Sequence, residues 1–189
     1  MIGSLDIGAG TSDIMICRYD YTNTSNPSRM KPIPLFWDSF DIAGDDMLQV
    51  LISNVLLQGK DGELEKELIN RGVEEEIARA KLFDFLGKDQ ITHSFIDKNL
   101  RRDFNLQVLV PIMYEYLRLH TDGEGTRDIS YTDVFNTSEP SIDVLKKFEN
   151  VFGFNLKEMI WHYDREILSR HIAASLDEQL LQKVAALMS

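Results

Sequence analysis

The strand-like and helix-like parts of this 189-residue sequence are separated along the chain. Ile2 to Ile7 and Asp13 to Tyr19 are rich in β-branched and apolar residues, with a Gly/Thr/Ser turn between them. A polar loop from Thr22 to Pro34 then precedes a third strand from Leu35 to Ile42. From Asp45 onward the apolar residues recur with a helical period. Strands first and helices afterwards predict a mixed α/β chain that opens with an antiparallel hairpin.

The rest of the chain is expected to be mainly helical. Pro111 should kink or break one of these helices, because proline cannot donate a backbone hydrogen bond. Thr121 to Asp128 is predicted to be a polar loop and Ile129 to Phe135 a short strand. We therefore expect residues 1–58 to form a sheet with a first helix, and residues 59–189 to form a mainly helical part. The expected helices are Asp45–Val55, Glu65–Ile69, Glu74–Leu86, Arg101–His120, Ser141–Phe152 and, in two or three pieces, Leu156–Met188.

The composition excludes several classes of function. Acidic side chains outnumber basic ones by 31 to 20, whereas a general nucleic-acid binder needs a basic surface. No apolar run approaches the roughly 20 residues that a membrane helix needs, so neither nucleic acid nor membrane is an expected partner. The one cysteine, Cys17, excludes an intramolecular disulfide and a multi-cysteine metal site, and it fits a cytoplasmic location.

Several conspicuous residues are better explained by packing than by chemistry. Cys17 follows a strand pattern and is expected to be buried. Trp37 and Trp161 are expected in the core or at an interface between lobes. His162 and His171 lie nine residues apart in a segment predicted to be helical, which places them on different faces and does not suggest a metal site.

The stretch "SLDIGAGTSDIMIC", from Ser4 to Cys17, contains a glycine turn that invites a functional interpretation. A Walker A loop would need a Lys-Ser/Thr pair after its glycines, and this turn has no such pair. A dinucleotide-binding loop would need a third glycine opening a helix, but Asp13 stands there and a strand follows. The turn therefore joins strand to strand.

A turn of this kind could bind a phosphate. Gly8 and Gly10 allow backbone N–H groups to face outward and a phosphate to approach without a Cβ in the way. Thr11 and Ser12 add hydroxyl donors. Asp6 and Asp13 flank the turn, and carboxylates beside a phosphate require a cation, which indicates Mg²⁺. The alternative is a tight hairpin turn with solvated aspartates.

A second stretch, "FDIAGDDMLQVLI" from Phe40 to Ile52, adds a glycine at the start of a helix. The two stretches together resemble the second phosphate-binding region of the actin/heat-shock-chaperone/sugar-kinase ATPase superfamily. Ala9 and Ala43 depart from that pattern, where glycine is usual. The segments "SLDIGAGTSDIMI", "FDIAGDDML" and "ARAKLFDFLGK" further resemble the SrfB-like bacterial virulence factors, which are similar to actin-like ATPases.

This resemblance implies an actin-like, ribonuclease-H-like lobe and a set of nucleotide contacts. By it, Asp6 would orient the attacking water or a Mg²⁺-bound water, and Asp13 would hold Mg²⁺ through a water. Lys81 in "ARAKL" is the single match to a ribose-contacting pattern, which leaves adenosine recognition by that helix in doubt. The ATP phosphates and the nucleotide cleft would be contacted by Gly8, Ala9, Gly10, Thr11, Ser12, Gly44 and Asp45.

The superfamily builds its active site from two lobes, and the motifs found here match only the second. We therefore expect the chain to be a fragment whose first partner is the other lobe of a larger parent, and we do not expect it to hydrolyse ATP alone. ATP and Mg²⁺ are expected cofactors of the parent. The alternative is a non-catalytic relative that serves as a scaffold, through a protein partner or self-assembly.

Overall fold

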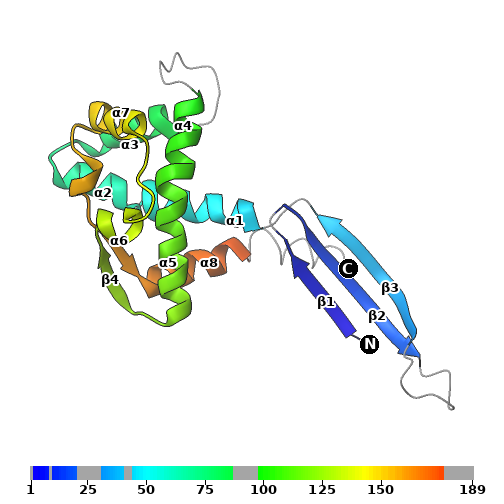
Figure 1. Ribbon diagram of the computed structural model, residues 1–189. Helices are drawn as coiled ribbons and strands as arrows, with labels where there is room; N and C mark the ends of the chain where they lie inside the picture. Colours follow the sequence, from blue (N-terminus) through cyan, green and yellow to red (C-terminus); the bar gives the residue numbers. More distant parts are fainter. Residues whose placement is uncertain (1, 9, 21–30, 41–43, 87–97, 177–189) are drawn as a thin grey trace. The chain divides into compact units, whose positions relative to one another are not determined.

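The computed structural model describes residues 2–8, 10–20, 31–40, 44–86 and 98–176 (Figure 1). The chain divides into two compact units. The first contains Met1–Met47 together with Asp177–Ser189, and the second contains Leu48–Leu176. Among the described residues, no helix is long and apolar enough to cross a membrane.

The first unit contains a three-stranded antiparallel sheet in the order β1-β2-β3. Its strands are β1 (Ile2–Ile7), β2 (Ser12–Asp20) and β3 (Lys31–Phe40), so the predicted hairpin and third strand are confirmed. The loop was predicted to extend to Pro34, but β3 already begins at Lys31 and includes Pro32 and Pro34. Within this sheet β3 lies at an edge, where a missing N–H need not remove a ladder bond.

The described part of the second unit is mainly helical, as predicted. The helices expected at Glu65–Ile69, Glu74–Leu86 and Ser141–Phe152 are confirmed, each to within two residues at either end. Its helical segments, with α1 beginning in the first unit, are α1 (Gly44–Leu51), the π-helical η1 (Ile52–Leu57), α2 (Glu63–Asn70), α3 (Glu75–Leu86), α4 (Lys98–Phe104), the π-helical η2 (Asn105–Leu109), α5 (Val110–Asp122), α6 (Tyr131–Phe135), α7 (Ile142–Phe152), the 3₁₀ turn η3 (Leu156–Glu158) and α8 (Arg165–Leu176).

Pro111 does not interrupt the helix in which it lies. α4, η2 and α5 follow one another without a gap (Figure 1), and the π-helical η2 ends at Leu109, two residues before Pro111. A proline ring displaces the carbonyl four residues earlier, here that of Gln107, and π-helical turns occur where the regular ladder is disturbed. The expected kink or break is therefore replaced by a local widening of the helix.

Two predictions after Gly123 are wrong. The strand expected at Ile129–Phe135 lies earlier, as β4 (Thr126–Ile129), and Tyr131–Phe135 forms α6 because Ser130 and Asp133 make a reciprocal capping box. The helical region expected from Leu156 contains a further strand, β5 (Trp161–Asp164), which pairs antiparallel with β4.

The burial of alternate side chains explains why these residues form the strand β5. Trp161 and Tyr163 are buried whereas His162 between them is exposed, which is the period of two that a strand requires. The part of the helical prediction that falls on residues 177–188 lies outside the described residues, as do Thr22–Met30 of the expected loop and Asp41 and Ile42 of the expected third strand.

The hydrophobic core lies in the second unit and is rich in aromatic side chains. Phe148 is fully buried and packs against Phe104, Phe152 and Phe154, with ring centroids 5.7, 4.8 and 5.1 Å away. Trp161 is also buried, which confirms its expected core position. This core holds α4, α7 and the segment that follows α7 together.

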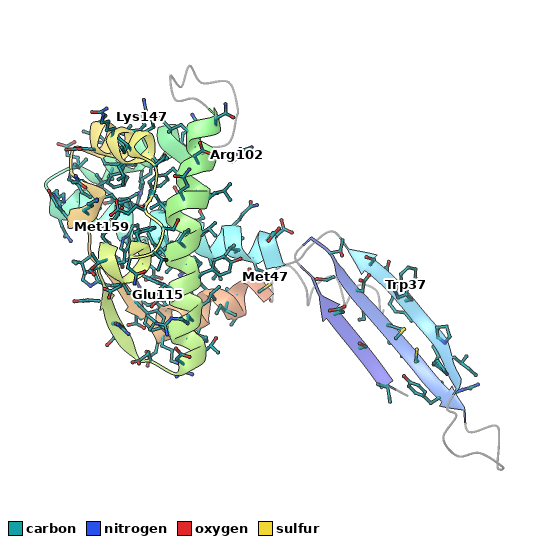
Figure 2. All side chains as sticks on the ribbon, in the orientation of Figure 1. Trp37, Met47, Arg102, Glu115, Lys147 and Met159 are labelled. Carbon is teal, nitrogen blue, oxygen red and sulfur yellow. The ribbon has the colours of Figure 1, made fainter. Side chains whose placement is uncertain are left out.

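The first unit has a different character. Cys17 is buried, as predicted, but Trp37 is 68% exposed and so is not a core residue. Its side chain lies directly opposite Met15 on the neighbouring strand, and Met15 is itself exposed (Figure 2). The sheet therefore carries large apolar side chains in solvent.

Candidate functional site

The β1–β2 turn is closed by a backbone hydrogen bond. The N–H of Gly8 donates to the carbonyl oxygen of Thr11 over 2.8 Å. A Cβ on Gly8 would lie 3.0 Å from the same oxygen, so the tight turn itself favours glycine there. Gly8 does not adopt a left-handed backbone, and its N–H already has an acceptor. Its role is thus to shape the turn rather than to offer a free donor.

Gly10 stands in a different environment. A Cβ added to Gly10 would meet no heavy atom within 4 Å, so the turn does not need glycine at this position for steric reasons. Gly10 and Thr11 are both exposed. This side of the turn therefore has room for an incoming group, whereas Ala9 between the two glycines lies outside the described residues.

Asp6 and Asp13 form a directly opposed pair across β1 and β2. Residues opposite each other in an antiparallel pair project from the same face, so the two carboxylates are neighbours. Ser39 of β3 continues the row beyond Asp13. Like charges directly opposite each other are destabilising, and this row contains no basic residue to offset them.

The second sequence motif meets the first through α1. The N–H of Gly44, the first residue of α1, donates to the carbonyl oxygen of Gly8 over 3.0 Å. The helix thus begins at the glycine turn, and Asp45 is exposed in its first turn. Four of the predicted site residues around this contact, Asp6, Gly8, Asp13 and Gly44, are brought together by the turn and its neighbouring strands.

Two other predicted site residues, Ser12 and Lys81, make different contacts. Ser12 is fully buried, so its hydroxyl is not at the exposed side of the turn. Lys81 is in the second unit, on α3, where its Nζ donates to the carbonyl oxygen of Val151 over 3.2 Å. That bond ties α3 to α7 and gives Lys81 a structural role.

The metal-binding capacity of the described residues is limited. They contain no group of three or more His, Cys, Asp or Glu side chains able to hold a metal ion. Mg²⁺ is usually held by one or two carboxylates, with waters and phosphate oxygens completing its octahedron. The Asp6–Asp13 pair fits that limited role and would not form an all-protein cage.

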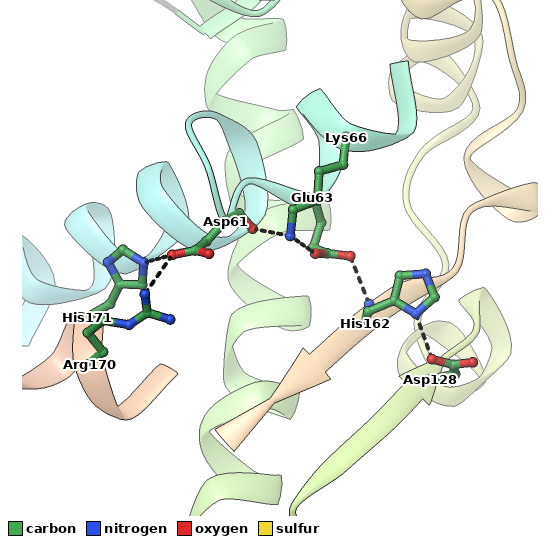
Figure 3. A network of polar contacts seen from close by, with 7 residues as sticks. All are labelled: Asp61, Glu63, Lys66, Asp128, His162, Arg170 and His171. Atoms are coloured by element: carbon green, nitrogen blue, oxygen red, sulfur yellow. Dashed lines mark hydrogen bonds and ion pairs between the residues drawn. The ribbon is translucent and has the colours of Figure 1, made fainter. Parts of the chain in front are cut away.

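The second unit contains a polar network that the sequence did not predict (Figure 3). Asp61, in the loop between η1 and α2, accepts a hydrogen bond from Nε2 of His171 over 2.9 Å, and Arg170 lies 3.9 Å away. Burial raises the pKa of Asp61, but the His171 hydrogen bond and the nearby positive charges outweigh it and lower the pKa. Asp61 therefore stays ionised and fastens the loop to α8.

The network continues to the β4–β5 ribbon (Figure 3). Lys66 donates to the backbone oxygen of Asp61 and to Glu63, and the buried Glu63 accepts the backbone N–H of His162 over 3.1 Å. His162 also contacts Asp128, its cross-strand partner, at 2.6 Å. Both of these side chains are exposed, so their pairing contributes little stability.

Comparison with known protein families shows to which family the chain belongs. A family model described as virulence factor SrfB matches residues 1–187. The chain belongs to the SrfB family. No curated protein and no solved structure matches it. The SrfB part of the sequence resemblance is thus confirmed, and the family's description associates the chain with virulence.

Proposed function

We propose that the β1–β2 turn of this SrfB chain binds the phosphates and Mg²⁺ of ATP, within an actin-like ATPase lobe. The observation that carries the proposal is the hydrogen bond from Gly44 to Gly8, which joins the two sequence motifs at one place. Glycine turns and helix N-termini are both suited to anionic groups, because their backbone N–H groups and the helix dipole favour negative charge.

The residues around the turn have separate roles in this proposal. Gly10 and Thr11, on the open side of the turn, offer donors and space to a phosphate. Asp6 and Asp13 bind the cation or its water ligands, and Asp6 orients the attacking water. The bound Mg²⁺ would neutralise phosphate charge, and it would also relieve the repulsion between the two opposed carboxylates.

The contrast between two glycines tests the turn directly. Gly10 and Gly3 both have room for a Cβ, so Gly10→Ala and Gly3→Ala should each leave the fold intact. In the complete protein that carries this sequence, Gly10→Ala should weaken Mg·ATP binding about tenfold or more, because a methyl group would occupy the phosphate's approach. Gly3→Ala, at the far end of β1, should bind as the wild type does. Calorimetric titration of Mg·ATP measures both, and equal affinities would contradict the role of the turn.

A second candidate is a scaffold that no longer binds nucleotide. It is favoured by exposed large apolar side chains among the described residues of the sheet, which are typical of a surface that meets a protein partner. These residues are Ile2, Met15, Leu35 and Trp37. A folded wild-type protein that fails to bind Mg·ATP would support this function. In that case Trp37→Ala should release the partner while leaving the fold unchanged.

A further inference from the structure

The two edges of the β4–β5 ribbon differ in what covers them. On the β5 side, the N–H of His162 donates to the buried carboxylate of Glu63 over 3.1 Å. Glu63 and β4 lie on opposite sides of β5 (Figure 3). On the β4 side, no further strand of the described residues pairs with the ribbon, and β4 lies at the outside of the second unit (Figure 1). The edge at β4 is therefore open.

The register shows which backbone groups of β4 face this open edge. In an antiparallel ladder, pairs that exchange hydrogen bonds alternate with pairs that do not, and the latter direct their N–H and C=O groups outward. Asp128 is opposite His162, whose N–H is bound outside the ribbon, so Asp128 belongs to an outward pair. Thr126, two residues earlier, belongs to the next such pair. Among the described residues, the outward backbone groups of Thr126 and Asp128 have no hydrogen-bond partner.

The side chain between these two residues carries a positive charge. Arg127 is exposed, and it forms no ion pair with another described residue. The pKa of Asp133 is lowered by its hydrogen bonds from Ser130 and, to a smaller extent, by the charge of Arg127. Since Asp133 is already held by Ser130, the guanidinium of Arg127 remains available to a carboxylate that approaches along the edge.

A second copy of this chain does not suit the edge, because its charges would repel. Pairing Thr126 of one copy with Asp128 of the other places the two Arg127 side chains opposite each other. Pairing Asp128 with Asp128 opposes two carboxylates, and pairing Thr126 with Thr126 places Asp128 opposite Glu124. Like charges directly opposite each other destabilise a strand pair. The charges of β4 therefore favour a different chain.

We propose that β4 binds an extended segment of another protein, which adds to the ribbon as an antiparallel third strand with an acidic residue opposite Arg127. Thr126 and Asp128 would each exchange backbone hydrogen bonds with the segment, and the side chains opposite them would set its specificity. A basic residue suits the position opposite Asp128. This surface is separate from the glycine turn, so the inference does not depend on nucleotide binding.

Nuclear magnetic resonance of the isotope-labelled full-length chain tests the proposal with a defined peptide. The probe is acetyl-Val-Lys-Glu-Thr-Val-amide, whose Lys, Glu and Thr would lie opposite Asp128, Arg127 and Thr126. The amide resonances of Thr126 and Asp128 should shift in a saturable way, and their hydrogen exchange should slow about fivefold or more at saturation. A probe N-methylated at Lys and Thr should cause no shift, because it cannot donate those hydrogen bonds.

A charge exchange tests the role of Arg127. Arg127→Glu should weaken binding of the probe about fivefold, since an attraction becomes a repulsion, and a probe with Lys in place of Glu should restore it. Arg102→Glu is the matched control: it removes an exposed cation from α4, changes the net charge equally, and should leave both affinities unchanged.

Three results would overturn the proposal. The first is no shift of Thr126 and Asp128 up to the solubility limit of the probe. The second is equal binding of the N-methylated probe, and the third is equal affinity of the wild type and Arg127→Glu. Protection of these two amides that rises with protein concentration, without peptide, would show that a second copy occupies the edge instead.

Discussion

Replacement of Phe148 by alanine is expected to destabilise the chain by about 3–5 kcal/mol. Phe148 is fully buried, and its ring contacts three other aromatic rings, those of Phe104, Phe152 and Phe154. Alanine would leave a cavity at the junction of α4, α7 and the segment after α7. Urea unfolding followed by circular dichroism measures the loss, which is a large part of the 5–15 kcal/mol typical of a whole domain.

The matched control for Phe148 is Phe83 on α3, which is 56% exposed. Phe83→Ala should change the free energy of unfolding by no more than about 0.5 kcal/mol, because it removes little packing. If the two substitutions had the same effect, Phe148 would not occupy the centre of the core.

Gly62→Ala is the second substitution with a large expected effect, about 2–4 kcal/mol of destabilisation. A Cβ at this position would lie 2.4–2.6 Å from the backbone N, C and Cα of Gln58, and backbone atoms cannot move aside as a flexible side chain does. The loop is also anchored: Gly59 donates its N–H to Glu65 over 2.5 Å, and Asp61 accepts from His171. Shifting the loop would therefore disturb both contacts.

Gly72→Ala separates steric clash from backbone strain. Gly72 has a φ of +88° but no atom within 4 Å of an added Cβ, so alanine there should cost only about 1–2 kcal/mol from the left-handed backbone. Thermal unfolding of the two variants side by side measures the difference. A Gly62→Ala variant as stable as Gly72→Ala would contradict the clash.

The elements predicted best from the sequence are those in which a pattern of strand-forming or apolar residues continues over a long stretch. β1 and β2 were found because each is a run of strand-forming residues on one side of a glycine turn. β5 was missed because four residues between helical segments carry too short an alternation to be recognised. The start of β3 was missed because Pro32 and Pro34 indicate a loop unless the strand is known to lie at an edge.

The residues of the candidate site were predicted from local sequence motifs. Their relative positions and burial became known only from the three-dimensional structure. The opposed positions of Asp6 and Asp13 follow from the hairpin register. The burial of Ser12 could not be read from its neighbours, since it depends on which face of the sheet is covered. The contact between Asp61 and His171 joins residues 110 positions apart, and neither residue lies in a recognisable motif.

The most direct test of the central claim is calorimetric titration of Mg·ATP into the complete protein, with wild type beside Asp13→Asn. Asp13 is half-exposed on the strand face beside Asp6, so the isosteric amide should preserve the fold while removing a carboxylate from the cation. We predict Mg²⁺-dependent binding by the wild type and a loss of about 10–100-fold in Asp13→Asn, the range seen when groups around a metal site are removed. Equal affinity of the two proteins, or no binding by a folded wild type, would contradict the assignment of the glycine turn as a phosphate-binding site.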